Sequence, residues 1–240
     1  IEKYPNRKLY ALAPNFRGVE NAVNAGITTI SYVISVSESH NKANIRRTHE
    51  ESLAELQKIM DTFPQADICV SLATVFGCPF EGIPPIQKPV DFAKRVYDMG
   101  IRSICLADTI GIADPKQVRE TITAMLAALP GCEFQIHIHD TRGMGLVNTL
   151  AAIECGITTV QSTLGGLGGC PFAPGASGNT ATEDLVYMLG RMGYDTGIDL
   201  EKLLAAAKHQ KSFIDGVYSG HQQNLTTTPP CCGGKHTYPT

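Results

Sequence analysis

Two histidines and an aspartate stand together in the segment IHIHD, residues 136–140. His137 and His139 are two residues apart in a run that reads as a β-strand, so both imidazoles project from the same side of it. Asp140 follows at the strand end. Two imidazoles that converge on one point suit a divalent cation such as zinc, manganese or iron. A pair of polar side chains that fills the interior of the fold is the alternative, but the adjoining carboxylate favours a metal site.

A long glycine-rich loop follows, with the sequence GGLGGCPFAPGASGN at residues 165–179. Its six glycines and two prolines exclude a regular helix or strand. Such a loop can bring its backbone close to a ligand and can close over a site. Cys170 lies at its centre and is a candidate nucleophile or proton donor, between which the sequence does not choose. A plain surface turn is the alternative, but a loop of this length is more often functional.

Carboxylates elsewhere offer further acid–base chemistry. Asp108 begins the segment DTIG directly after the apolar run SICLA, so its side chain is expected at a strand end. There it can act as a general base or hold a catalytic side chain in place, and capping the following turn explains it equally well. Glu81 in CPFEG is expected to be a solvated loop charge. The same holds for Glu38, although its place after a predicted strand keeps it a candidate.

The elements that must position these residues alternate along the chain. Short β-branched runs alternate with longer amphipathic ones, which indicates a parallel sheet covered by helices. Strands are predicted at Leu9–Ala13, Thr28–Ile34, Ile68–Thr74, Arg102–Ala107, Phe134–His139 and Thr158–Thr163. Helices are predicted at Phe16–Ala25, Thr48–Phe63, Pro89–Met99, Pro115–Leu129, Gly145–Cys155, Thr182–Gly190 and Leu200–Tyr218. The phrases NAGITTI, DMGIRSI and ECGITTV each read as a helix end, a left-handed glycine and a buried strand.

A (β/α)8 barrel and a doubly wound sheet both fit this alternation. No GxGxxG follows a strand, which weakens the nucleotide-binding doubly wound fold. The polar candidates fall at the carboxyl ends of strands, where a barrel collects its chemistry. We therefore predict an α/β fold, a (β/α)8 TIM barrel with additional C-terminal helices. Only six βα units can be counted, so the first two are expected to lie before Ile1.

The composition is that of a globular protein, with 43% hydrophobic and 18% charged residues and a formal charge of -3. It provides no basic field for nucleic acid and no apolar stretch for a membrane span, so neither is expected as a partner. The eight cysteines lie mostly in apolar runs without a CxxC pair, which favours a reducing cytoplasm over secretion. One catalytic domain is expected over residues 1–225, followed by an irregular tail at 226–240.

With these residues in place, the chain resembles the HMGL-like TIM-barrel metallo-lyases, and among them the 3-hydroxy-3-methylglutaryl-CoA lyases. The resemblance runs from about Leu9 to Tyr218. Its most specific motifs are GLGGCPFAPGASGN, IHIHDTRGMGLVNTL, ATEDLVYML, LADTIG and FGCPFEG. The related condensing synthases share the HxHD strand but typically carry GxGERxGN where this chain has GGCPFAPGASGN. The loop therefore favours a lyase over a synthase.

The resemblance implies a role for each candidate residue. His137, His139 and Asn179 match the family's metal ligands. Cys170 matches the loop cysteine needed for catalysis, and Asp108 matches an aspartate tied to catalysis. The family's remaining protein ligand is an aspartate in an RDG-type motif, beside a catalytic arginine on the first strand. That motif is absent here and is expected upstream, in the two missing βα units.

The implied reaction is a retro-Claisen cleavage of 3-hydroxy-3-methylglutaryl-CoA to acetyl-CoA and acetoacetate. Asp108, or His137 where metal does not fully engage it, would take the proton of the C3 hydroxyl, and Cys170 would supply one to the enolate. An oxygen-rich substrate favours Mg²⁺ or Mn²⁺ over zinc. Ser71 stands where lyases usually have a tyrosine, so a neighbouring acyl-CoA is a second possible substrate. Family members tend to dimerise, so a homodimer is expected.

Two other functions remain open on the sequence alone. The first is a condensing synthase that joins acetyl-CoA to an oxoacid, and the loop sequence argues against it. The second is a non-catalytic barrel that binds or regulates a partner. The missing aspartate and arginine would support that second function if the natural chain began at Ile1.

Overall fold

The computed structural model describes residues 7–169 and 178–225. Its elements are β1 (Tyr10–Ala13), α1 (Phe16–Asn24), β2 (Thr29–Ser35), α2 (Glu38–Ile45), α3 (His49–Thr62), β3 (Asp67–Ala73), α4 (Gln87–Asp98), β4 (Ser103–Asp108), α5 (Pro115–Ala128), β5 (Glu133–Ile138), α6 (Gly145–Glu154), β6 (Thr159–Gln161), the 3-10 turn η1 (Leu164–Gly166), α7 (Thr182–Arg191), α8 (Leu200–Lys211) and the 3-10 turn η2 (Gln222–Asn224). No helix in these two ranges is long and apolar enough to cross a membrane.

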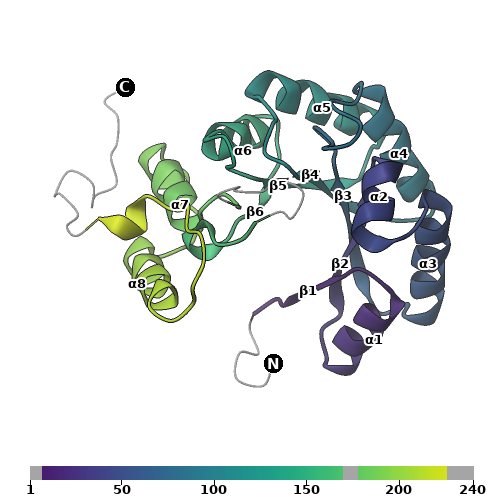
Figure 1. Ribbon diagram of the computed structural model, residues 1–240, viewed down its shortest axis with the longest axis horizontal. Coiled ribbons are helices and arrows are strands. Elements are labelled where there is room, and N and C mark those ends of the chain that lie inside the picture. The colour runs from purple at the N-terminus through teal and green to yellow at the C-terminus, as the bar shows by residue number, and fades with distance from the viewer. Residues whose placement is uncertain (1–6, 170–177, 226–240) are drawn as a thin grey trace.

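The six strands form one parallel sheet in the order β1-β2-β3-β4-β5-β6. Each strand pairs with the next one along the chain, as expected of consecutive βα units. The sheet curls, and α1, α3, α4, α5 and α6 cover its outer side (Figure 1). β1 and β6 are its two edge strands. The parallel α/β architecture and the count of six βα units predicted from the sequence are confirmed.

The two faces of the sheet differ in character because strand residues alternate between them. The outer face packs fully buried apolar side chains against the helices, among them Val70, Leu72, Ile104, Leu106 and Ile136. The alternate positions are small or polar. Gln161 Nε2 donates to Gln135 Oε1 at 3.0 Å, and Gln135 Nε2 donates to Ser103 Oγ at 3.2 Å. His137 lies two residues after Gln135 in β5, so this inner face leads toward it.

Local signals in the sequence are confirmed at several helix ends. Asp114 caps α5, because its Oδ1 accepts hydrogen bonds from Lys116 N at 2.8 Å and Gln117 N at 2.9 Å. Pro115 takes the first helical position, as predicted. The glycines of the three repeated phrases all have left-handed backbone angles, with φ of 83°, 105° and 97° at residues 26, 100 and 156. None of the cysteines in the described ranges forms a disulfide.

One helix was not predicted and one predicted boundary differs from the structure, whereas the other boundaries agree to within two residues. The segment after β2 forms the helix α2, which was not predicted because its eight residues carry no clear apolar face. Ser37 begins it by accepting a hydrogen bond from His40 N at 3.1 Å. The last long helix was predicted to extend to Tyr218 but ends at Lys211, and the following residues turn back toward α7.

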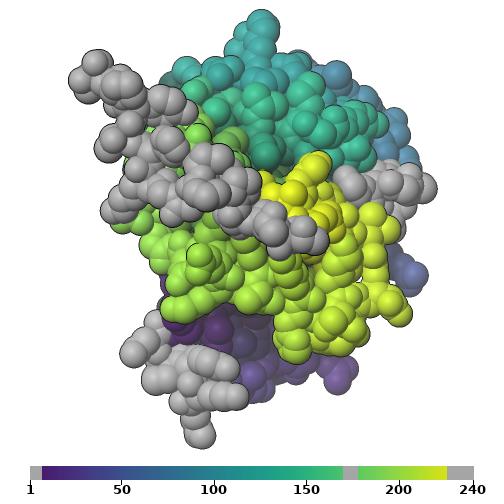
Figure 2. Space-filling model, turned by 90° about the vertical axis from the view of Figure 1, so that its left-hand side faces the viewer, coloured from purple at the N-terminus to yellow at the C-terminus, as the bar shows by residue number. Residues whose placement is uncertain are grey.

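The C-terminal elements α7, α8 and η2 lie beside β6 (Figure 1). In the space-filling view onto that side, their green-to-yellow surface lies between the teal middle of the chain and its purple N-terminal part (Figure 2). The Asp184 carboxylate joins α7 to η2 by accepting hydrogen bonds from His221 N and Gln222 N, both at 2.8 Å. The predicted tail at 226–240 lies outside the described residues.

A hydrogen-bonded network ties α3 to β2. The fully buried Tyr32 donates its hydroxyl to Glu55 Oε2 at 2.9 Å. Arg47 binds the same carboxylate through two nitrogens, with Nη2 to Oε1 at 2.8 Å. Burial, followed by the charge of Glu55, raises the pKa of Tyr32.

We expect Glu55→Ala to lower the free energy of unfolding by about 2 to 3 kcal/mol, because it leaves Arg47 without its carboxylate and Tyr32 without its anionic acceptor. Urea denaturation at neutral pH would measure this loss. Glu38→Ala is the control, since Glu38 forms an exposed pair with Lys42. That control should cost less than about 0.5 kcal/mol. Equal losses for the two variants would contradict a stabilising network at Glu55.

Candidate active site

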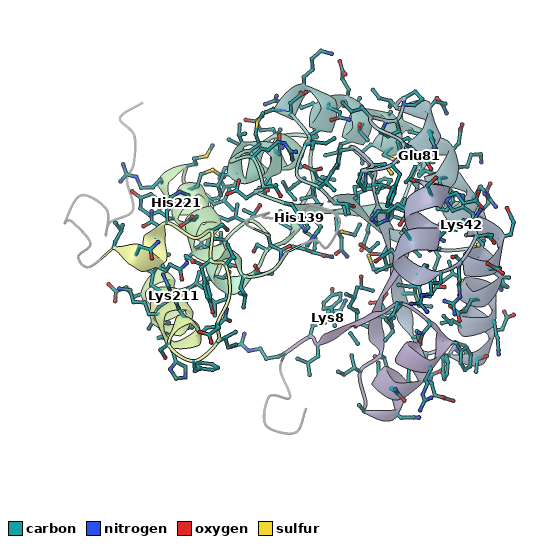
Figure 3. All side chains as sticks on the ribbon, viewed as in Figure 1. Lys8, Lys42, Glu81, His139, Lys211 and His221 are labelled. Carbon is teal, nitrogen blue, oxygen red and sulfur yellow. The ribbon has the colours of Figure 1, made fainter. Side chains whose placement is uncertain are left out.

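The two histidines meet at the carboxyl end of β5. His137 lies in the strand and His139 directly after it, and their Nε2 atoms are 3.2 Å apart. The two rings are inclined by 67°. His139 lies toward the middle of the molecule, between the region that carries Glu81 and the C-terminal region that carries His221 (Figure 3). The structure therefore brings both imidazoles to one point, as their spacing along the strand predicts.

Both imidazoles are uncharged at neutral pH. Burial, together with the neighbouring His139, lowers the pKa of His137 to about 4. Burial also lowers the pKa of His139. A neutral imidazole keeps a lone pair on one ring nitrogen, which is the form that binds a metal ion.

Asn179 lies beside His139 because the end of the glycine-rich loop folds back onto the tip of β5. The backbones of His139 and Asn179 form an isolated β-bridge. Thr180 N donates to Ile138 O at 3.2 Å, and Asp140 N donates to Gly178 O at 3.0 Å. The Asn179 Nδ2 donates to Leu167 O at 3.2 Å, whereas its buried Oδ1 has no hydrogen-bond partner among the described residues.

These three residues fit a divalent cation. They offer two neutral imidazoles with facing Nε2 atoms and one buried amide oxygen whose hydrogen-bonding capacity is unused. The described ranges contain no group of three or more His, Cys, Asp or Glu side chains that could hold a metal. A cation at this point would therefore need the Asn179 amide and further oxygen ligands.

The described ends of the glycine-rich loop pack backbone against backbone. A Cβ added at Gly178 would lie 1.9 Å from Gly168 O, and one at Gly168 would lie 2.4 Å from Asn179 Nδ2. Both glycines also have positive φ, 138° at Gly168 and 87° at Gly178. Glycine at both positions lets the two ends approach and places Asn179 at the base of the loop. Cys170 lies outside the described residues.

Asp108 is the last residue of β4 and is completely buried. Its Oδ1 accepts a hydrogen bond from Ile112 N and its Oδ2 one from Ala113 N, both at 3.1 Å. Burial raises the pKa of Asp108 to about 6, although these amide hydrogen bonds oppose the shift. The capping role considered for Asp108 is thus present. Asp108 pairs in register with Ile138, the residue between His137 and His139, so its backbone adjoins the segment that carries the imidazole pair.

Comparisons with known proteins identify the family of the chain. The family model described as HMGL-like matches residues 2–209. The chain belongs to the HMGL-like family. Hydroxymethylglutaryl-CoA lyase YngG of Bacillus subtilis (strain 168) is 46% identical over 200 residues, which cover 82% of this chain and 67% of that protein. Cytoplasmic 3-hydroxy-3-methylglutaryl-CoA lyase of Mus musculus is 41% identical over 210 residues, covering 87% and 61%. The chain thus spans about two thirds of the length of these relatives.

Solved structures of the HMGL-like family have the same fold. The crystal structure of HMG-CoA lyase from Bacillus subtilis matches with a TM-score of 0.85 at 41% identity, over 90% of this chain and 73% of that chain. HMG-CoA lyase from Acinetobacter baumannii, in complex with coenzyme A and 3-methylmalate, matches with a TM-score of 0.84 at 37% identity, over 94% and 76%. The fold extends to the carboxyl transferase domain of Rhizobium etli pyruvate carboxylase, at 16% identity and a TM-score of 0.65.

Two carboxylates of this HMGL-like chain accept specific hydrogen bonds. Glu81 was expected to be a solvated loop charge, and it lies exposed in the loop after β3. It accepts hydrogen bonds from Ser37 Oγ at 2.7 Å and Lys88 Nζ at 2.6 Å. Burial raises its pKa, but these bonds prevail and lower the pKa of Glu81 to about 2. Asp140 accepts a hydrogen bond from Gly145 N at 2.6 Å and so braces the start of α6.

Arg142 is a site residue that the sequence did not single out. Its Nη1 donates to Ile110 O at 2.8 Å and to Gly111 O at 3.1 Å, which joins the loop after β5 to the loop after β4. The second loop supplies the amides that bind Asp108. In the sequence HDTRG, an arginine is expected to be a surface charge. Its contact with the loop after β4 can be recognised only from the structure, which places the two carbonyl acceptors beside it.

Proposed function

We propose that the chain is part of a divalent-metal-dependent carbon–carbon lyase that cleaves 3-hydroxy-3-methylglutaryl-CoA to acetyl-CoA and acetoacetate. The observation that carries this proposal is the meeting of His137 and His139 beside Asn179 at the strand tips, with their Nε2 atoms 3.2 Å apart. Several relatives named as HMG-CoA lyases support the reaction. His137, His139 and Asn179 would hold Mg²⁺ or Mn²⁺.

The acid–base groups of the chain suit a retro-Claisen reaction. When bound, the cation would acidify a substrate hydroxyl and orient an adjacent oxygen. Asp108, with a pKa of about 6, can accept the C3 hydroxyl proton at neutral pH. His137 is the other candidate base. Cleavage of the C2–C3 bond leaves an electron pair on C2 of the thioester, and Cys170 would supply the proton that C2 takes up.

The catalytic unit proposed here covers residues 1–225 and acts as a homodimer in the cytoplasm on an acyl-CoA substrate. The Acinetobacter baumannii relative contains coenzyme A, which supports a thioester substrate. The relative from Mus musculus is named cytoplasmic, which supports that compartment. The tendency of the family to dimerise supports the oligomeric state.

A lyase acting on a related 3-hydroxyacyl-CoA is the second candidate, and Ser71 favours it. Ser71 is half-buried on the inner face of β3, where it pairs in register with Cys105 of β4 and Val33 of β2. A serine occupies much less of this face than the tyrosine usual in lyases. The smaller side chain would leave room for a different acyl group.

Assaying the whole protein with 3-hydroxy-3-methylglutaryl-CoA and Mn²⁺ or Mg²⁺ would test the proposal. Acetoacetate and acetyl-CoA should form in equal amounts, and EDTA should stop their formation. A set of 3-hydroxyacyl-CoA thioesters assayed in parallel would test the second candidate. A metal-loaded protein that releases no acetoacetate would overturn the first function, and cleavage of another thioester would then favour the second.

A further inference from the structure

Thr74 has an unusual backbone conformation at the end of β3. Its φ is 59°, in the left-handed region that a β-branched residue rarely adopts. Arg46 is the other described non-glycine residue with positive φ, and it has an ordinary reason for this as the C-cap of α2. Thr74 is buried and follows a strand, so such an explanation does not apply. Strained residues of this kind cluster at functional sites.

Three hydrogen bonds hold Thr74 in place. Its N donates to Thr109 Oγ1 at 2.7 Å, and its Oγ1 donates to Ala73 O at 2.7 Å. The same oxygen accepts a hydrogen bond from Ser37 N at 3.1 Å. The amide after β2 thus donates to a hydroxyl after β3, and the amide after β3 donates to a hydroxyl after β4. We call the residues Ser37, Thr74 and Thr109 the hydroxyl brace.

The brace ends beside the proposed catalytic groups. Thr109 directly follows Asp108, whose own carbonyl accepts a hydrogen bond from Gly111 N at 3.2 Å. The loop that Thr109 begins packs closely against His139, because a Cβ added at Gly111 would lie 3.0 Å from His139 O. The side chain of Thr109 is therefore fixed toward β3, while the loop that it begins packs against His139, the residue after β5. A rotation of Thr109 would displace both Asp108 and the loop that packs against His139.

We propose that Thr74 and Thr109 are positioning residues of the lyase. The hydroxyl brace fixes the end of β4, which carries Asp108, and the loop that follows it against His139. This inference rests on the proposed function and adds two residues to which that function gives no role. Residues that hold the groups around a metal site in place commonly affect metal affinity or activity by about 10- to 100-fold. The left-handed backbone of Thr74 directs its amide at the Thr109 hydroxyl, and this hydrogen bond helps to hold the strained conformation.

Thr109→Val in the whole protein tests the brace, since valine keeps the shape of threonine and removes the acceptor for Thr74 N. We expect kcat to fall about 10- to 100-fold while KM changes by less than about threefold. The dissociation constant for Mn²⁺ alone, measured by electron paramagnetic resonance without substrate, should rise about tenfold. Thr109→Ser restores the oxygen and should recover most of both values. Should the valine variant not fold, Thr109→Ala gives the same readouts.

Tyr32→Phe is the matched control, because it removes another buried hydroxyl on the outer side of the sheet. It should lower the free energy of unfolding while leaving kcat within about twofold of the wild type. A Thr109→Val protein with unchanged kcat and Mn²⁺ affinity would overturn the proposal, and so would an equal loss of kcat in Tyr32→Phe. If the wild type cleaves no thioester but Thr109→Val still weakens Mn²⁺ binding and serine restores it, the brace stands and the proposed function fails.

Discussion

His137→Ala is expected to lower kcat for acetoacetate formation by about a thousandfold or more, because a metal ligand contributes several kcal/mol to transition-state stabilisation. The side chain is half-buried and its Nε2 lies 3.2 Å from that of His139. Alanine would therefore remove one nitrogen ligand and leave the other imidazole without its partner. Mn²⁺ should also no longer bind at micromolar concentration, which electron paramagnetic resonance would measure independently of turnover.

His209→Ala provides the matched control for this variant. His209 lies in the last turn of α8, far along the chain from β5. Its ring packs against that of Phe213, with the ring centroids 4.9 Å apart. Its removal should leave kcat and Mn²⁺ binding unchanged. His137→Gln, which keeps more of the buried volume, separates loss of the ligand from loss of packing. Activity within about tenfold of the wild type in both His137 variants would exclude a metal ligand at this position.

The sequence predicted most of the fold because its local and long-range signals agree. Alternating apolar strands and amphipathic helices specify the parallel sheet, and left-handed glycines such as Gly26 and Gly100 mark where each helix gives way to a strand. The spacing of His137 and His139 on one strand is enough to bring their rings together, since residues two apart share a face. Asn179 became a candidate through the family motif, and the structure places it beside His139.

The remaining features depend on contacts that the local sequence does not encode. The helix α2 has no apolar periodicity, so only its Ser37 cap and its packing define it. Thr74 belongs to an apolar run that reads as continuous strand, yet hydrogen bonds from two neighbouring strands hold it in the left-handed region. Glu81 is exposed, yet it also accepts a hydrogen bond from Ser37, which lies 44 residues away in sequence and next to it in space.

Asp108→Asn is expected to lower kcat by about 100- to 10,000-fold at pH 7.5, because an amide cannot accept the hydroxyl proton. For the wild type, kcat/KM should rise with pH up to about 6 and then level off, since burial raises the pKa of Asp108 to about 6. Initial rates of acetoacetate formation from pH 5 to 8 would measure this profile. Asp67→Asn, at the exposed amino end of β3, should leave the rates unchanged.

The Asp108→Asn variant should also lack one pH-dependent loss of stability that the wild type shows. The folded-state pKa of about 6 exceeds the ordinary value of 3.8, so the native state binds this proton more tightly than the unfolded chain does. The contribution of Asp108 to the free energy of unfolding is therefore greatest below pH 3.8 and is lost as the pH rises through 6. The full change for this shift is about 3 kcal/mol and part of it lies below pH 4, so the wild-type value minus the Asp108→Asn value should fall by about 2 kcal/mol between pH 4 and 7. A difference that stays constant in urea titrations over this range would show that Asp108 ionises as readily in the folded protein as in the unfolded chain.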